Sequence, residues 1–182
     1  MENTQMPQPL MSLAVHVADL LKQSKARIVF AESCTAGLVS ATLARVPGIS
    51  EFHCGSAVVY RLATKTRWLG ISEQLLNDPG PVSDEVARAM AEGVLTRTPE
   101  ADLAVSITGH LGPNAPTDQD GLIFVGFARR TSLGIHVTTF DHILPSQISD
   151  RVVTGAESIR EWRQWKATET ALNHVCEQLQ KW

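Results

Sequence analysis

The chain has 182 residues, of which 43% are hydrophobic and 19% charged. This composition can fill a sizeable core and excludes a largely disordered chain. The net charge is −3 and no basic face is evident, so we expect no nucleic-acid partner. The longest apolar runs are of strand length, far below the roughly 20 residues that a bilayer span requires, and we expect no membrane partner.

The N-terminus and the cysteines bear on compartment and organisation. Residues 1–9 are polar, contain prolines and have no apolar run, so we expect a loose tail rather than a signal peptide, followed by one domain over 10–182. Cys34, Cys54 and Cys176 are odd in number and have no metal-like spacing. We therefore expect reduced thiols, a cytoplasmic protein and no metal site.

Helical and strand patterns alternate through most of the chain. The expected elements are a helix at 10–24, a strand at 27–31, a helix at 38–46, a strand at 56–60, a helix at 63–69, a short helix from Ser72, a helix capped by Ser83 and a strand at 102–108. Strands at 122–128 and 135–140 then form a hairpin, and a helix at 158–179 closes the chain. This order predicts a three-layer α/β/α sandwich with a mixed, mostly parallel sheet.

Hydroxyl, phenol and amine groups flank the strand expected at 56–60. A Pro-Gly turn precedes Ser50, Tyr60 ends the strand, and Lys65 lies one turn into the next helix. A serine becomes a useful nucleophile when a neighbouring base takes its proton, and a buried lysine with a lowered pKa can be that base. On spacing alone, the alternative is an exposed loop serine, a half-buried tyrosine and a solvated lysine.

Two turns that follow buried strands are further candidates for binding. The turn from Glu32 to Gly37 has free N–H groups at a helix start that would suit an anion such as phosphate. Simple capping by Ser33 or Thr35 is the interpretation that its local sequence favours. The breaker-rich loop after the strand at 102–108 begins near His110, which either contacts substrate or bonds to the backbone.

Several motifs occur together in an order that resembles the C-terminal domain of the CinA competence/damage-inducible proteins. That domain also occurs alone as nicotinamide-nucleotide (NMN) amidohydrolase. The matching stretches are residues 31–37 (AESCTAG), 46–50 (VPGIS), the Tyr60…Lys65 pair, 69–72 (LGIS), 81–87 (PVSDEVA) and the Thr-Gly…Gly-Pro loop at 108–113. The resemblance covers about residues 10–128, and more weakly the last helix.

The resemblance implies an α/β/α domain that hydrolyses the carboxamide of NMN to the acid and ammonia. It gives the catalytic roles to Ser50, Tyr60 and Lys65 and implies no cofactor. The residues expected to bind the nucleotide substrate are Ser33, Thr35, Gly37, Gly55, Thr108, Gly109, His110 and Arg160. We also expect a homo-oligomer.

The chain departs from the family pattern inside the expected pocket. Leu62 replaces an asparagine, His110 and Leu111 replace Ile-Ala, and 114–122 lacks the usual glycines and the Lys-Pro-Val-Gly-Thr segment. A CinA-like paralogue that binds nucleotides or regulates without turnover is therefore the alternative to an amidase. An interaction domain of a competence or repair assembly is a third hypothesis, which the lack of a basic patch disfavours.

Overall fold

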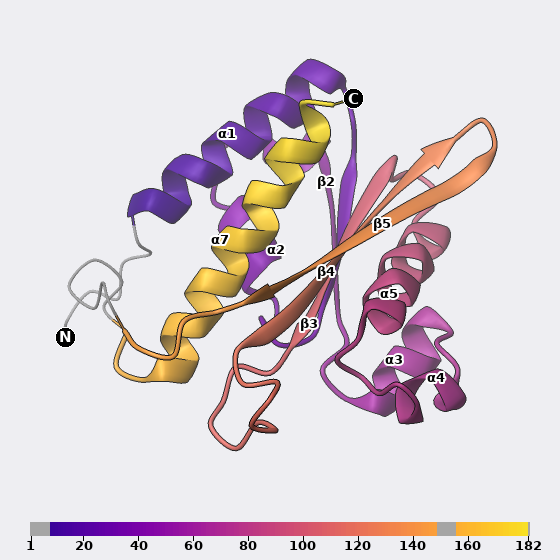
Figure 1. Cartoon of the computed structure of the whole chain (residues 1–182). Helices are drawn as coiled ribbons and strands as arrows, with labels where there is room; N and C mark the ends of the chain where they lie inside the picture. The colour runs from indigo at the N-terminus through magenta and orange to yellow at the C-terminus, as the bar shows by residue number, and fades with distance from the viewer. Residues whose placement is uncertain (1–7, 149–155, 182) are drawn as a thin grey trace.

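The computed structural model describes residues 8–148 and 156–181 (Figure 1). Its sheet has the order β2-β1-β3-β4-β5. The strands are β1 (Ile28–Glu32), β2 (His53–Val58), β3 (Leu103–Gly109), β4 (Leu122–Thr131) and β5 (Gly134–Ile143). β1 pairs in parallel with β2 and β3, whereas the β3–β4 and β4–β5 pairs are antiparallel. The carboxyl ends of β1, β2 and β3 therefore lie at one edge of the sheet.

Helices cover both faces of this sheet (Figure 1). The described helices are α1 (Gln8–Ser24), α2 (Leu38–Leu43), the 3₁₀ helix η1 (Ile49–Glu51), α3 (Leu62–Leu69), α4 (Glu73–Asn77), α5 (Asp84–Arg97) and α7 (Ile159–Leu179). α1, α2 and α7 lie on one face, and α3, α4 and α5 lie on the other. The predicted three-layer α/β/α sandwich with a mixed sheet is confirmed.

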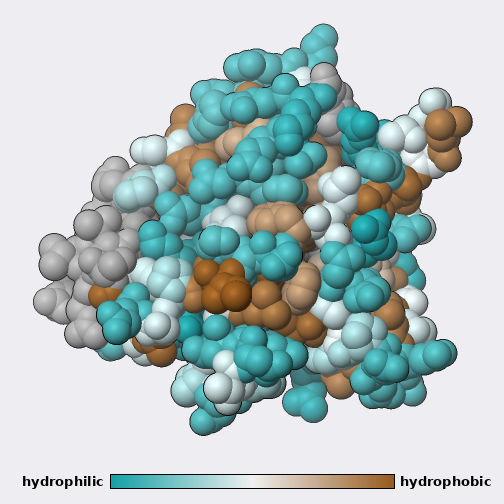
Figure 2. Space-filling view, in the orientation of Figure 1, coloured by the Kyte–Doolittle hydropathy of each residue, from teal (hydrophilic) through white to brown (hydrophobic). Residues whose placement is uncertain are grey.

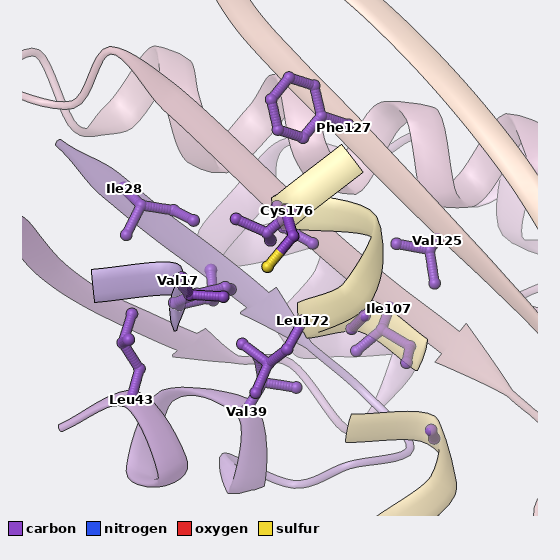
Figure 3. Close-up of a cluster of buried hydrophobic side chains, with 14 of the residues drawn as sticks. Val17, Ile28, Val39, Leu43, Ile107, Val125, Phe127, Leu172 and Cys176 are labelled. Carbon is purple, nitrogen blue, oxygen red and sulfur yellow. The ribbon is translucent and has the colours of Figure 1, made fainter. Parts of the chain in front are cut away.

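Alternate side chains of the buried strands supply two separate hydrophobic clusters. Ile28 of β1 points to the larger one, with Leu172 of α7 (Figure 3). Phe30 and Val175 belong to the same cluster. Val29 and Ala31 point to the smaller one, beneath α3 and α5. Because β1 is buried on both faces, its sequence is a continuous apolar run rather than an alternating one.

The structure shifts several predicted boundaries. β2 begins at His53, three residues before the predicted start. Its first residues are polar or glycine, which an edge strand paired only with β1 tolerates, so an apolar run did not mark its start. α1 begins at Gln8, so the expected tail is shortened, and residues 1–7 lie outside the described part. Most of the poorly patterned stretch at 144–156, namely 149–155, is also outside it.

The surface of the face shown in Figure 2 is largely hydrophilic along α1 and α7. Their apolar stripes, in contrast, contribute to the larger core cluster. Among the helices in the described ranges, none is both long and apolar enough to cross a membrane.

Candidate active site

A pocket of about 610 Å³ lies where β1, β2 and β3 end. Its wall includes Ser33, Cys34, Tyr60, Lys65, Thr108 and Arg160. Ser33 and Cys34 follow β1, Tyr60 follows β2, and Thr108 is near the end of β3, so the parallel strands bring together segments that are distant in sequence. Ligand sites of open α/β sheets usually form at this edge.

Ser33 and Lys65 are in direct contact within this pocket. The Nζ atom of Lys65 donates hydrogen bonds to Ser33 Oγ and to the Val59 carbonyl oxygen, both 2.7 Å long. α3 starts after Arg61, whose extended backbone turns the chain, and it places Lys65 on its inner face. Ser33 is fixed in turn because its N–H donates to the Ile107 carbonyl at 3.0 Å.

Lys65 is nearly inaccessible to solvent, with 1% of its surface exposed. Burial penalises the ammonium form and lowers the pKa of Lys65 from 10.5 to about 8, while the nearby Cys34 has a smaller, opposite effect. Among the described residues, no carboxylate forms an ion pair with it. A role as base requires a depressed pKa at Lys65, and here burial rather than a neighbouring cation lowers it. Close to neutral pH, a fraction of this amine is uncharged and can accept a proton.

Tyr60 and Arg160 close one side of the pocket. Tyr60 is 54% exposed, and its hydroxyl accepts a 2.7 Å hydrogen bond from Nη2 of Arg160. Nη1 of Arg160 donates to the Gly112 carbonyl oxygen, also at 2.7 Å. Since the Tyr60 oxygen is the acceptor in this pair, its own O–H remains able to donate. One arginine thus links α7, the β2–α3 connection and the loop after β3.

Glu32, the last residue of β1, occupies the helix start that the sequence suggested for an anion. Its buried carboxylate accepts hydrogen bonds from the backbone N–H groups of Gly37, Val39 and Ser40 at 2.9–3.0 Å. It also accepts from the hydroxyl of Thr35 at 2.8 Å. A side-chain anion, Glu32, therefore occupies the N–H groups that the sequence suggested for an external anion. The expected capping by Ser33 or Thr35 is wrong, because Gly37 is the N-cap and no side-chain cap bond forms there.

The expected contact between Ser50 and Lys65 is not formed. Ser50 is an exposed residue of η1 and precedes β2, whereas Tyr60 follows the same strand. The six residues of β2, which lie between the two positions, span roughly 20 Å at about 3.3 Å per residue. Ser50 therefore lies near the amino-terminal end of β2, whereas the pocket lies at the carboxyl ends of the parallel strands. Ser33, expected only to bind substrate, takes the place beside Lys65.

The other predicted binding residues divide into two groups. Thr108, Gly109 and His110 line the pocket, as expected, and the hydroxyl of Thr108 donates to the Pro81 carbonyl at 2.8 Å. The backbone of His110 is fixed by bonds to Leu122 and Gly121, while its ring lines the pocket.

Three predicted residues are not part of the pocket wall. Thr35 and Gly37 bind the Glu32 carboxylate instead. Gly55 lies in the middle of the edge strand β2, away from the strand ends. Thr35 and Gly37 thus help to hold the start of α2, and Gly55 forms part of β2; none of the three lines the pocket.

The described wall of the pocket is cationic. Arg61, Lys65 and Arg160 line it, and neither aspartate nor glutamate is among the lining residues. Beside them, Leu62 replaces the amide that the family pattern has at this position and stands 47% exposed at the mouth. The arrangement favours an anionic ligand.

Cys34 lies next to Ser33 but is a poor nucleophile. Burial raises the pKa of its thiol to about 12, so the thiolate is scarce at neutral pH. Within the described ranges, no group of three or more His, Cys, Asp or Glu residues is placed to hold a metal ion.

Sequence reasoning missed two buried charged residues. Glu32 was treated as part of a turn, although a lone acid that ends an apolar strand just before a helix is a recognisable capping signal. Arg163 was not considered, yet it forms a bidentate ion pair with the loop residue Asp120, with both N···O distances at 2.8 Å. Nothing local in the sequence links two residues so far apart.

Comparison with known sequences agrees with this architecture. The CinA C-terminal domain family matches residues 10–161. A putative competence-damage inducible protein of Halothermothrix orenii is 40% identical over 119 residues, which are 64% of this chain and 29% of that protein. A CinA-like protein of Prochlorococcus marinus is 45% identical over 119 residues, which are 64% of this chain and 28% of that protein. The chain thus matches less than a third of the length of either relative.

Solved structures show the same fold. Competence damage-inducible protein A (ComA) from Klebsiella pneumoniae aligns with a TM-score of 0.82 at 23% identity, over 95% of this chain and 98% of that one. The competence/damage inducible protein CihA from Agrobacterium tumefaciens aligns with a TM-score of 0.75 at 27% identity, over 94% of this chain and 99% of that one. The motif order, the fold and the matched residues lead to one conclusion: this chain belongs to the CinA C-terminal domain family.

Proposed function

We propose that this protein is an amidohydrolase in which Ser33 is the nucleophile and Lys65 the general base. The observation that carries the proposal is the 2.7 Å contact between Lys65 Nζ and Ser33 Oγ, made by an amine whose pKa burial lowers to about 8. A serine paired with a neutral lysine is an established way to activate a hydroxyl. The proposal moves the nucleophile from Ser50 to Ser33 and keeps the expected roles of Tyr60 and Lys65.

The reaction begins with neutral Lys65. Its amine takes the proton of Ser33 as the oxygen attacks the carboxamide carbon, which forms a tetrahedral oxyanion. The N–H of Cys34 is suited to bind this oxyanion, because the residue after a serine nucleophile commonly supplies one donor. Such a donor typically contributes about 3 kcal/mol to transition-state stabilisation.

Collapse of the intermediate breaks the C–N bond. Lys65 returns its proton to the departing nitrogen, which leaves as ammonia, and Ser33 remains acylated. Water then attacks the acyl carbon while Lys65 accepts its proton. The bond between Ser33 Oγ and the acyl carbon breaks, Lys65 gives the proton to Oγ, and the carboxylic acid is released. Tyr60 lies at the pocket mouth, where its O–H can donate to the amide or to the leaving nitrogen while Arg160 holds its oxygen.

The substrate class follows from the pocket and the family resemblance together. While Lys65 is neutral, Arg61 and Arg160 keep the wall cationic, and none of the described acidic side chains lines it, which suits an amide that carries a phosphate or carboxylate. The family resemblance makes NMN the first candidate. The polar handle that the family pattern places at position 62 is absent here, so we propose that NMN itself is a slow substrate.

The test combines product detection with trapping of the intermediate. Wild-type protein is incubated with NMN and with p-nitrophenyl acetate, a small activated ester, and ammonia and nitrophenolate are measured. We expect nitrophenolate release with an acyl group on Ser33 by mass spectrometry, and slow ammonia release from NMN. Absence of acylation at Ser33 by the ester, in folded protein at mildly alkaline pH, would overturn the mechanism.

A further inference from the structure

Arg163 of α7 carries a buried guanidinium group outside the pocket. Its side chain is 2% exposed, and its two Nη atoms donate to the two carboxylate oxygens of Asp120 at 2.8 Å each. Its Nε donates to the Pro145 carbonyl oxygen at 3.1 Å. A charge this deeply buried is strongly unfavourable without partners, and the fork of an arginine gives the pair a defined orientation.

Two glycines leave room for this guanidinium. Gly112 and Gly121 have φ values of 69° and 83°, which few other residues adopt. A Cβ atom on Gly112 would lie 3.0 Å from Nη1 of Arg163, and one on Gly121 would lie 3.3 Å from Nη2. The backbone at both positions therefore curves closely around the arginine head.

The same two glycines belong to the loop that follows β3, here called the pocket loop and defined as residues 110–121. Arg160, one turn before Arg163 on α7, binds the Gly112 carbonyl near its start. Arg163 binds Asp120 near its end. α7 thus holds the pocket loop at two points.

The pocket loop begins with a residue of the pocket wall. The His110 carbonyl oxygen accepts from the Gly121 N–H at 2.9 Å, so the first and last residues of the loop are joined next to Asp120. The hydrogen bond from Arg163 lowers the pKa of Asp120, and His110 adds a smaller effect in the same direction. Asp120 directly precedes Gly121, so a shift of Asp120 would reach His110 through the Gly121–His110 hydrogen bond.

We propose that Arg163 is a positioning residue: through Asp120 it holds the pocket loop so that His110 and Arg160 line the ligand pocket. Asp120 stands in the segment 118–122, which differs from the Lys-Pro-Val-Gly-Thr of the family pattern. The inference depends on the proposed function only in taking this pocket as the ligand site. It predicts that Arg163 affects ligand binding and leaves the Ser33–Lys65 chemistry intact, because those residues come from β1 and α3.

The experiment compares Arg163→Met, Arg163→Lys and Asp120→Asn with wild type. The matched control is Arg130→Met, which removes an arginine that binds the carbonyls of Ala101 and Leu95 away from the pocket. Three quantities are measured on each folded protein: amide hydrogen exchange across 110–121, acylation of Ser33 by p-nitrophenyl acetate, and the NMN concentration that halves this acylation.

We expect Arg163→Met and Asp120→Asn to speed exchange across 110–121 by at least ~10-fold and to raise the half-protecting NMN concentration similarly, with acylation within ~3-fold of wild type. Arg163→Lys should give exchange rates and half-protecting NMN concentrations between those of these variants and wild type, because lysine keeps the charge but cannot form the bidentate hydrogen bond. Unchanged exchange in the pocket loop would overturn the inference. So would an equal loss of acylation and loop protection, since Arg163 would then be a general core contact. Failure of wild-type acylation would instead overturn the proposed mechanism, and the exchange measurement would still decide the role of Arg163.

Discussion

Replacing Lys65 by methionine should change how the stability of the protein depends on pH. In the wild type, the amine has a pKa of about 8 when folded and 10.5 as its ordinary value. Methionine has a similar shape and no titratable group. The difference in unfolding free energy between the two proteins therefore isolates the buried amine from other titrating groups.

The magnitude and the sign follow from these two pKa values. Below the folded pKa of about 8, both states carry the proton, and the buried ammonium destabilises the folded state by about 3 kcal/mol. Between about 8 and 10.5, the folded protein has lost this proton while the unfolded chain still binds it. Stability linked to Lys65 therefore rises with pH in this window. Cys34, whose pKa burial raises to about 12, opposes the rise, but it is present in both proteins.

Urea denaturation of both proteins at several pH values measures this effect. Between about pH 7 and about pH 10, the wild type should gain about 2.5 kcal/mol relative to Lys65→Met. The rate of Ser33 acylation in the wild type should rise over the same range, with a midpoint near the folded pKa of about 8. A stability difference that does not change with pH would show that Lys65 keeps its ordinary pKa, and the argument for a neutral base would then be refuted.

Three further substitutions test the site. Ser33→Ala should reduce acylation by p-nitrophenyl acetate at least ~1000-fold, whereas Ser50→Ala, near the amino-terminal end of β2, should stay within ~2-fold; the reverse result would restore Ser50 as nucleophile. Glu32→Gln should lower the free energy of unfolding by about 3 kcal/mol in urea denaturation, because an amide cannot accept every bond that the carboxylate accepts; a loss below about 1 kcal/mol would contradict this. Leu62→Asn should raise kcat/KM for ammonia release from NMN by less than ~10-fold, because one added hydrogen bond contributes about 1 kcal/mol. A rise of several orders of magnitude would show that the differences in the pocket loop do not limit NMN hydrolysis.

The fold was predictable because its signals are local and repeat along the chain. Apolar periodicity identified α1, α5 and α7, and the continuous apolar runs of β1 and β3 identified buried strands. The order of these elements was then sufficient for a three-layer sandwich. Strand β2 was placed three residues too late, because edge-strand residues need not be apolar.

The site was only partly predictable, because pairing across the sheet depends on strand order. Tyr60 and Lys65 came from their spacing and the family resemblance, and Arg160 came from the resemblance alone; all three line the pocket. The position of Ser33 depends on which end of β2 meets the end of β1. The sequence predicted Ser50 as nucleophile and Ser33 only as a binding residue, because parallel pairing, which brings Ser33 close in space, is not a local signal.

The two hydrogen bonds of Arg160 determine what a ligand gains on entering the pocket. Its guanidinium already donates to Tyr60 and to the Gly112 carbonyl, which are neutral acceptors. These bonds use two of the five N–H donors of the arginine, so an incoming anion can bind a remaining donor while both stay formed. The two bonds also hold the guanidinium in one orientation before the ligand arrives. Arg160 therefore has little side-chain freedom left to lose on binding, and more of each new charged hydrogen bond appears as affinity.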